Sequence, residues 1–142
     1  MLDIQRFDHI GIRISDRDRS VAFYEKLGFE MIADGGYGAG HPLVMLHPSG
    51  ININLLGPAT AKAGENILMD MDEKYPGITH IAVQVADAEI TEQFVTEADI
   101  AITGRRDFRG VKTIFIRDPD RNVLELIGPG PSAAENIAGR KL

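Results

Sequence analysis

The sequence predicts an α+β fold built from two copies of a βαβββ module. The first observation is a repeated motif, because FDHIGIRI surrounds His9 and ITHIAVQV surrounds His80, which follows 71 positions later. The second is that the module ends match at the same offset, with PSGININLL at 48–56 corresponding to PDRNVLELI at 119–127. One offset that aligns both ends indicates an internal repeat, which defines the architecture before any single element is assigned.

The first module is predicted to occupy residues 7–56. Polar and apolar side chains alternate in residues 7–14, as they do in a strand with one buried face. A helix follows from Asp16 or Asp18. It ends just before Gly28, because glycine readily adopts the left-handed backbone conformation that ends many helices. Three further strands are expected at 29–34, 42–47 and 50–56.

The second module is predicted to occupy residues 78–128 with the same order of elements. Strands are expected at 78–85, 100–105, 111–117 and 121–128, and a helix at 88–98. Residues 57–77 form the linker between the modules, and residues 129–142 form a polar tail that we expect to be loose. The chain is then one domain of two curved mixed sheets, with helices outside and the other sheet faces around a shared cavity.

Composition narrows the class of protein. A chain of 142 residues suits one domain, and its net charge of −6 opposes binding to nucleic acid, which rewards clustered Lys and Arg. No stretch approaches the roughly 20 apolar residues of a membrane span, and the N-terminus lacks the apolar core of a signal peptide. The chain has no cysteine, so thiolate metal sites, disulfides and cysteine nucleophiles are excluded. We therefore expect a cytoplasmic protein whose metal ligands, if it has any, are His, carboxylate or amide.

Strand parity separates a set of polar side chains from the apolar faces of the predicted strands. The set comprises His9, Arg13, Asn52, Asn54, His80, Gln84 and Glu125. The repeat places four of them at equivalent positions of the two modules, namely His9, Asn54, His80 and Glu125. Two imidazoles and one carboxylate make a facial triad with open positions for water and substrate, so His9, His80 and Glu125 are predicted to hold one divalent cation. The alternative is that they are ordinary solvent-facing residues of half-buried sheets.

The remaining polar side chains have less specific predictions. Asn54 is a candidate fourth metal position, a water-bridging group or a surface amide. Arg13 is either a surface arginine or a pocket residue that binds a substrate carboxylate. Asn52 and Gln84 are candidate substrate-binding residues. The other two histidines, His41 and His47, lie near predicted loops and are expected to be plain loop residues.

At these residues the chain resembles the vicinal oxygen chelate superfamily, which includes glyoxalase I, fosfomycin-resistance and bleomycin-resistance proteins and extradiol dioxygenases. The similar segments are FDHIGIRISDRDRSVAFYEKLGF, YPGITHIAVQVAD and RDPDRNVLELI, and the resemblance covers about residues 7–128. It implies the glyoxalase/bleomycin resistance/dioxygenase fold. These motifs are specific for the superfamily and do not select one activity within it.

The resemblance also implies roles for individual residues. His9, His80 and Glu125 match the ligands on the first, fifth and last strands, and Asn54 stands where glyoxalase I usually has a glutamate. Arg13 stands where glyoxalase I has an arginine that binds the glutathione carboxylate. The resemblance further implies a homodimer, in which His9 and Asn54 of one subunit share a site with His80 and Glu125 of the other.

The function expected from these observations is that of a metal-dependent glyoxalase-like enzyme acting on a small substrate with neighbouring oxygens, including a thiol conjugate. Lyase or isomerase chemistry and thiol transfer stay open, as do the alternatives of an extradiol-type dioxygenase and a non-catalytic antibiotic-binding protein. The ligand set suits Zn, Ni, Mn, Co or Fe(II). The resemblance implies that Glu125 moves a proton, whereas Asn54 is a neutral amide and cannot serve as a second base.

Overall fold

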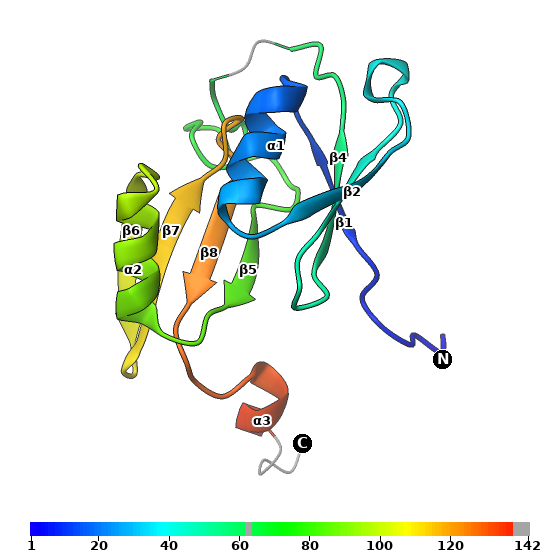
Figure 1. Cartoon of the computed structure of the whole chain (residues 1–142). Helices are drawn as coiled ribbons and strands as arrows, with labels where there is room; N and C mark the ends of the chain where they lie inside the picture. The colour runs from blue at the N-terminus through cyan, green and yellow to red at the C-terminus, as the bar shows by residue number, and fades with distance from the viewer. Residues whose placement is uncertain (62–63, 138–142) are drawn as a thin grey trace. The chain divides into compact units, whose positions relative to one another are not determined.

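Two four-stranded mixed sheets and three helices make up the protein in the computed structural model, which describes residues 1–61 and 64–137 (Figure 1). The chain divides into two compact units, each with one sheet. Unit 1 comprises Met1–Glu73 together with Asp118–Arg121, and unit 2 comprises Lys74–Arg117 and the chain from Asn122 onward. The predicted α+β class is confirmed.

Unit 1 contains the first βαβββ module. Its elements are β1 (Ile10–Arg13), α1 (Arg17–Lys26), β2 (Glu30–Asp34), the 3-10 turn η1 (Tyr37–Ala39), β3 (Leu43–Leu46) and β4 (Asn52–Leu56). The strand order is β1-β4-β3-β2, with β1 parallel to β4 and the other pairs antiparallel. The predicted helix boundaries hold, since the side chain of Asp16 accepts from the backbone N–H of Arg19 and Gly28 has a φ of 95°.

Unit 2 repeats this arrangement. Its elements are β5 (His80–Gln84), α2 (Ala88–Glu97), β6 (Ile102–Phe108), β7 (Val111–Arg117), β8 (Val123–Ile127) and the short α3 (Ala133–Ile137). The strand order β5-β8-β7-β6 corresponds strand for strand to that of unit 1. The register corresponds as well, because Gly11 pairs with Asn54 in one sheet and Ala82 pairs with Glu125 in the other. The offset of 71 residues seen in the sequence is therefore a structural repeat.

The strands of unit 1 have one buried and one open face, as the alternation of apolar and polar residues along them predicts. The buried face consists of Ile12, Leu43, Met45, Ile53 and Leu55, and it forms the core with Tyr24 and Val21 of α1. Gly11, Arg13, Asn52 and Asn54 belong to the opposite, open face by strand parity, and they are exposed or half-buried. The polar residues selected from the sequence therefore share one face of this sheet.

Some predicted boundaries are wrong at the element ends. The first strand begins at Ile10 instead of residue 7, so His9 lies just before it, and the fifth strand begins at His80 instead of residue 78. The physical reason is that β4 starts only at Asn52, and Ile10 already pairs with Ile53, which leaves little partner strand for earlier residues. In the predicted loose tail, Ala133–Ile137 forms a helix, and residues 138–142 lie outside the described part.

The turn between β7 and β8 packs within unit 1 through two aspartates. The hydroxyl of Tyr24, which is fully buried, donates to Oδ2 of Asp118 at 2.9 Å, and Asp118 is itself only 3% exposed. Asp120 accepts from the backbone N–H and the hydroxyl of Ser15. The turn was predicted only as a connection, whereas its carboxylates also contribute to the packing of α1 and β1.

This contact predicts a loss of stability at alkaline pH. Burial and the negative charge of Asp118 raise the pKa of Tyr24 well above its usual value. The folded state therefore holds the phenolic proton more tightly than the unfolded chain. The resulting stability is complete below the unfolded pKa of about 10 and falls as pH rises above it. Urea unfolding at pH 8 to 11 should show this fall in the wild type, and Tyr24→Phe should flatten it; an identical slope in both proteins would contradict the assignment.

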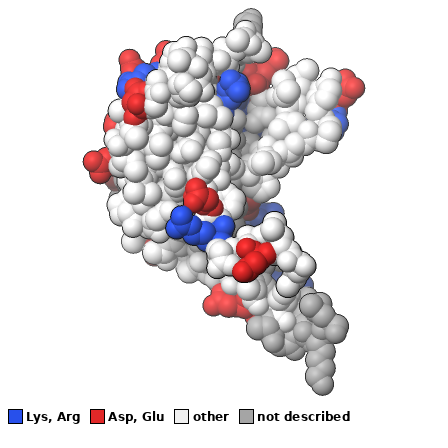
Figure 2. Space-filling model, turned by 90° about the vertical axis from the view of Figure 1, so that its right-hand side faces the viewer, with Lys and Arg blue, Asp and Glu red and all other residues white. Residues whose placement is uncertain are grey.

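Charged side chains are distributed in small groups of mixed sign on the face drawn in Figure 2. In the part of the chain that the structure describes, none of the helices has the length and apolar character needed to cross a lipid bilayer.

Candidate metal centre

His80 and Glu125 come together on neighbouring strands of unit 2. β5 and β8 are parallel, and the pairing of Ala82 with Glu125 places Glu125 diagonally across from His80 on the same face. The imidazole Nε2 lies 3.1 Å from Oε2 of the carboxylate. The His80 side chain is 42% exposed and that of Glu125 only 7%, so the carboxylate lies at the base of the pair and the imidazole at its open side.

The distance between these two atoms fits ligands of one cation. Two ligand atoms that each lie about 2.1 Å from a metal at a right angle are about 3.0 Å apart. An imidazole nitrogen and a carboxylate oxygen also suit Zn, Ni, Mn, Co or Fe(II) in their chemistry. The two side chains therefore meet the requirement for neighbouring positions in a coordination shell. The same contact is an ion pair whenever His80 is protonated.

Both predicted histidine ligands use the same ring nitrogen for a local contact. Nδ1 of His80 lies 2.8 Å from the hydroxyl of Thr79, and Nδ1 of His9 lies 2.8 Å from the carboxylate of Asp8. The hydrogen bond to His9 and the charge of Arg6 lower the pKa of Asp8. A carboxylate or hydroxyl on one ring nitrogen fixes the ring orientation and leaves the other nitrogen for a metal. Nε2 is therefore the available ligand atom in both modules.

Arg106 contacts the other oxygen of Glu125, a partner that sequence reasoning did not identify. Its guanidinium donates to Oε1 at 2.7 Å, while Oε2 faces His80. The only signal in the sequence was two adjacent arginines, Arg105 and Arg106, at the end of the strand predicted at 100–105. That boundary was wrong, because β6 pairs with β7 as far as Phe108 and so includes Arg106. A buried carboxylate needs such a partner, because an isolated buried charge is costly.

Two amide oxygens on β4 are buried without a hydrogen-bond partner among residues 1–61 and 64–137. They are Oδ1 of Asn52 and Oδ1 of Asn54, on alternate residues of one strand and hence on one face. Unsatisfied buried acceptors are uncommon in native proteins and call for a ligand, an ion or a water. The chemistry of Asn54 therefore fits the position that the repeat relates to Glu125, as a neutral oxygen ligand or a water-binding group.

The two remaining predicted binding residues differ in their surroundings. Arg13 is exposed on the open face of the first sheet, and within the described residues it has no ion-pair partner. Gln84, by contrast, donates its amide to the carbonyl oxygen of Gly130 at 2.7 Å. This bond ties the segment after β8 to β5, so the amide of Gln84 already has a structural partner, whereas Arg13 is available for an anionic group.

Two of the three predicted metal ligands are thus adjacent, and the third belongs to the other unit. His80 and Glu125 lie in unit 2, whereas His9 lies in unit 1. Within residues 1–61 and 64–137, no group of three or more His, Asp or Glu side chains is close enough to hold a metal ion. The complete ligand set, and the participation of His9 in it, stay predictions.

A family model shows what kind of protein this is. The model of the Glyoxalase/Bleomycin resistance protein/Dioxygenase superfamily matches residues 6–126. The chain belongs to this superfamily. The superfamily includes glyoxalases and dioxygenases, and its members generally bind small molecules and a divalent metal. No functionally curated protein sequence matches the chain.

Solved structures agree with this membership. A glyoxalase family protein from Enterococcus faecalis is 25% identical with a TM-score of 0.74, over 89% of this chain and 99% of that one. An antibiotic binding protein, TnmS3 from Streptomyces sp. CB03234, is 20% identical with a TM-score of 0.68, over 92% and 100%. Lactoylglutathione lyase from Agrobacterium tumefaciens is 17% identical with a TM-score of 0.65, over 89% and 96%. The last two likenesses concern the fold alone.

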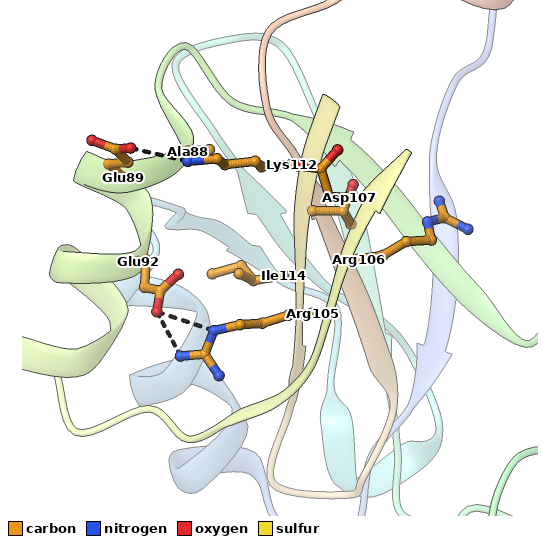
Figure 3. Close-up of a pocket in the computed structure, with 9 residues that line it drawn as sticks. Ala88, Glu89, Glu92, Arg105, Arg106, Asp107, Lys112 and Ile114 are labelled. Atoms are coloured by element: carbon orange, nitrogen blue, oxygen red, sulfur yellow. Dashed lines mark hydrogen bonds and ion pairs between the residues drawn. The ribbon is translucent and has the colours of Figure 1, made fainter. Parts of the chain in front are cut away.

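Unit 2 also has a groove on the other side of its sheet, between α2 and strands β6 and β7 (Figure 3). Four of its charged side chains form two pairs, in which Arg105 bonds Glu92 at 2.5 Å and Lys112 bonds Glu89 at 3.0 Å. These exposed pairs contribute little to stability. The groove therefore differs from the His80–Glu125 face, where the carboxylate is buried.

Proposed function

We propose that this protein is a metal-dependent, glyoxalase-like enzyme of the cytoplasm that acts on a small substrate with two neighbouring oxygens. The reaction class is that of a lyase, an isomerase or a thiol transferase. The observation that carries the proposal is the 3.1 Å approach of His80 Nε2 and Glu125 Oε2, on a carboxylate that is otherwise buried. A buried carboxylate beside an exposed imidazole is an arrangement that a divalent cation stabilises.

His80, Glu125 and His9 would hold the metal, with Asn54 as a direct or water-mediated fourth position. The unpaired Oδ1 of Asn54 and the contact of His9 with Asp8 through Nδ1, which leaves Nε2 for a metal, support these assignments. We further propose a homodimer, in which His9 and Asn54 of one subunit complete the site formed by His80 and Glu125 of the other. When bound, the metal would polarise substrate oxygens as a Lewis acid.

The other residues of the site would orient the substrate and move its proton. Glu125 would release the metal and accept a substrate proton at Oε2, because Oε1 is held by Arg106. Arg13 would bind an anionic group such as the carboxylate of a thiol conjugate, since its guanidinium is exposed. Asn52 would bind a substrate hydroxyl or N–H through its unpaired amide oxygen.

Metal content and turnover test this function together. Elemental analysis of the purified protein should find one divalent cation per chain, and turnover should be sought with the methylglyoxal–glutathione adduct, fosfomycin plus thiol, and catechols. His80→Ala should reduce metal affinity by about 100-fold or more, because ligand loss should exceed the 10- to 100-fold effect of outer-shell changes. His41→Ala is the matched control, since His41 lies in an exposed loop. A wild type without metal, or a His80→Ala protein that keeps it, would refute the proposal.

A second candidate function is a metal-free small-molecule binder, related in role to the antibiotic binding protein found among the similar folds. The observation that favours it is the ion pair between Arg106 and Glu125, which neutralises the buried carboxylate without a metal ion. Such a protein would bind a small ligand with equal affinity before and after treatment with a chelator. The enzyme would lose binding and turnover after the same treatment.

A further inference from the structure

We infer that Arg106 is a positioning residue, which holds Glu125 so that only one carboxylate oxygen is available to a metal. The inference rests on the proposed function and adds to the site a residue that is not itself one of the proposed metal ligands. Arg106 bonds Oε1 at 2.7 Å, and Oε2 is the oxygen that faces His80 at 3.1 Å. The two oxygens of one carboxylate therefore have different partners.

The sheet register explains how Arg106 reaches Glu125 across an intervening strand. β7 lies between β6 and β8, with Phe115 opposite Glu125 and Thr113 opposite Arg106. Phe115, Thr113 and Arg106 therefore share the face that carries Glu125. The guanidinium lies 6.0 Å from the centre of the Phe115 ring, so the aromatic side chain of β7 supports the arginine on its path.

The preceding arginine has the opposite orientation. Arg105 extends to the α2 side and bonds Glu92 through Nε and Nη2, whereas Arg106 extends away from α2 (Figure 3). The difference follows from strand parity, because successive side chains point to opposite faces. Arg105 and Arg106 thus have the same side chain and lie on the same strand, but they point to opposite faces of the sheet. Arg105 is therefore a matched control for Arg106.

The arrangement has a consequence for metal coordination. A free carboxylate binds a cation through one or both oxygens, and both modes are common. The guanidinium of Arg106 on Oε1 opposes binding through both oxygens, because Oε1 would have to lose a strong charge-assisted hydrogen bond before it could bind the metal. Glu125 would then bind the metal through Oε2 alone, which would leave room for the second oxygen of a substrate.

Cobalt(II) provides the test, because its visible absorption reports coordination number. Wild type, Arg106→Met, Arg106→Lys and Arg105→Met are loaded with Co2+, and affinity is measured by competition with a chelator. Arg106→Met should bind Co2+ with an altered spectrum of higher coordination number and with an affinity changed by about 10- to 100-fold. Arg106→Lys should restore the wild-type spectrum in large part, and Arg105→Met should leave spectrum and affinity unchanged. Urea unfolding of each apoprotein verifies that the variants are folded.

The outcomes separate the inference from the function on which it rests. If the wild type takes up no Co2+, both the metal-dependent function and the role of Arg106 are wrong. If the wild type binds Co2+ and the folded Arg106→Met protein has the same spectrum and affinity, only the role of Arg106 is wrong. A change that Arg105→Met reproduces would also overturn it, because Arg105 does not face Glu125.

Discussion

Replacing Glu125 by glutamine should abolish tight metal binding while leaving the protein folded. Glutamine has the size of glutamate but presents a neutral amide, which is a poor ligand for a divalent cation. We expect metal affinity to fall by at least about 100-fold, beyond the usual effect of changing an outer-shell residue. Turnover should fall with it, since the same change removes the proposed proton acceptor at Oε2.

Stability should change much less than metal binding in this variant. The Arg106 side chain is 58% exposed and can bond to water when its carboxylate partner is gone. We therefore expect the free energy of unfolding of the apoprotein to change by about 1 kcal/mol at most. Calorimetric metal titration and urea unfolding measure the two effects separately. A folded Glu125→Gln protein with wild-type metal affinity would contradict the assignment of Glu125 as a ligand.

Glu92→Gln is the matched control for this experiment. Glu92 has the same side chain and also bonds an arginine, but it lies on α2 and faces the groove on the other side of the sheet (Figure 3). The hydrogen bond from Arg105 lowers its pKa, so it is charged at neutral pH. The control therefore removes one paired carboxylate from the same unit, and metal affinity should stay at the wild-type value.

The repeat made most of the fold predictable. The offset between His9 and His80, together with the matching ends at Asn54 and Glu125, predicts two modules with equal strand order. The structure has that order and the corresponding register in both sheets. Local patterns predicted β7 at its observed boundaries and the helix stop at Gly28. These features depend on short-range periodicity and turn chemistry, which a sequence displays directly.

The partners of the buried carboxylates were not predictable in the same way. Arg106 reaches Glu125 across β7, and its face depends on the register shift between Ile102 and Gly104 in β6. The sequence gives no sign of that shift, and moving the register by one residue would exchange the faces of Arg105 and Arg106. The contact of Asp118 with Tyr24 was not predictable either, because the residues that indicate a turn do not indicate which helix the turn packs against.

Replacing Asp118 by alanine should give the largest loss of stability among the changes considered. The carboxylate is 3% exposed, accepts the buried Tyr24 hydroxyl at 2.9 Å and accepts the backbone N–H of Asp120 at 2.9 Å. Its removal leaves a buried hydroxyl without an acceptor and loosens the turn whose Asp120 carboxylate bonds Ser15. We expect the free energy of unfolding to fall by about 3 kcal/mol, since breaking one side of a buried charged contact usually costs this much or more.

Two further variants show whether that loss comes from the buried contact. Asp118→Asn keeps an oxygen that can accept from Tyr24, so it should lose about 1 kcal/mol, the usual net contribution of one hydrogen bond. Asp72→Ala removes an exposed aspartate and should change stability by less than about 0.5 kcal/mol. Urea unfolding at pH 7 ranks the three proteins. If Asp118→Ala were as stable as Asp72→Ala, the turn would contribute nothing to unit 1, and the packing of α1 would depend on its apolar face alone.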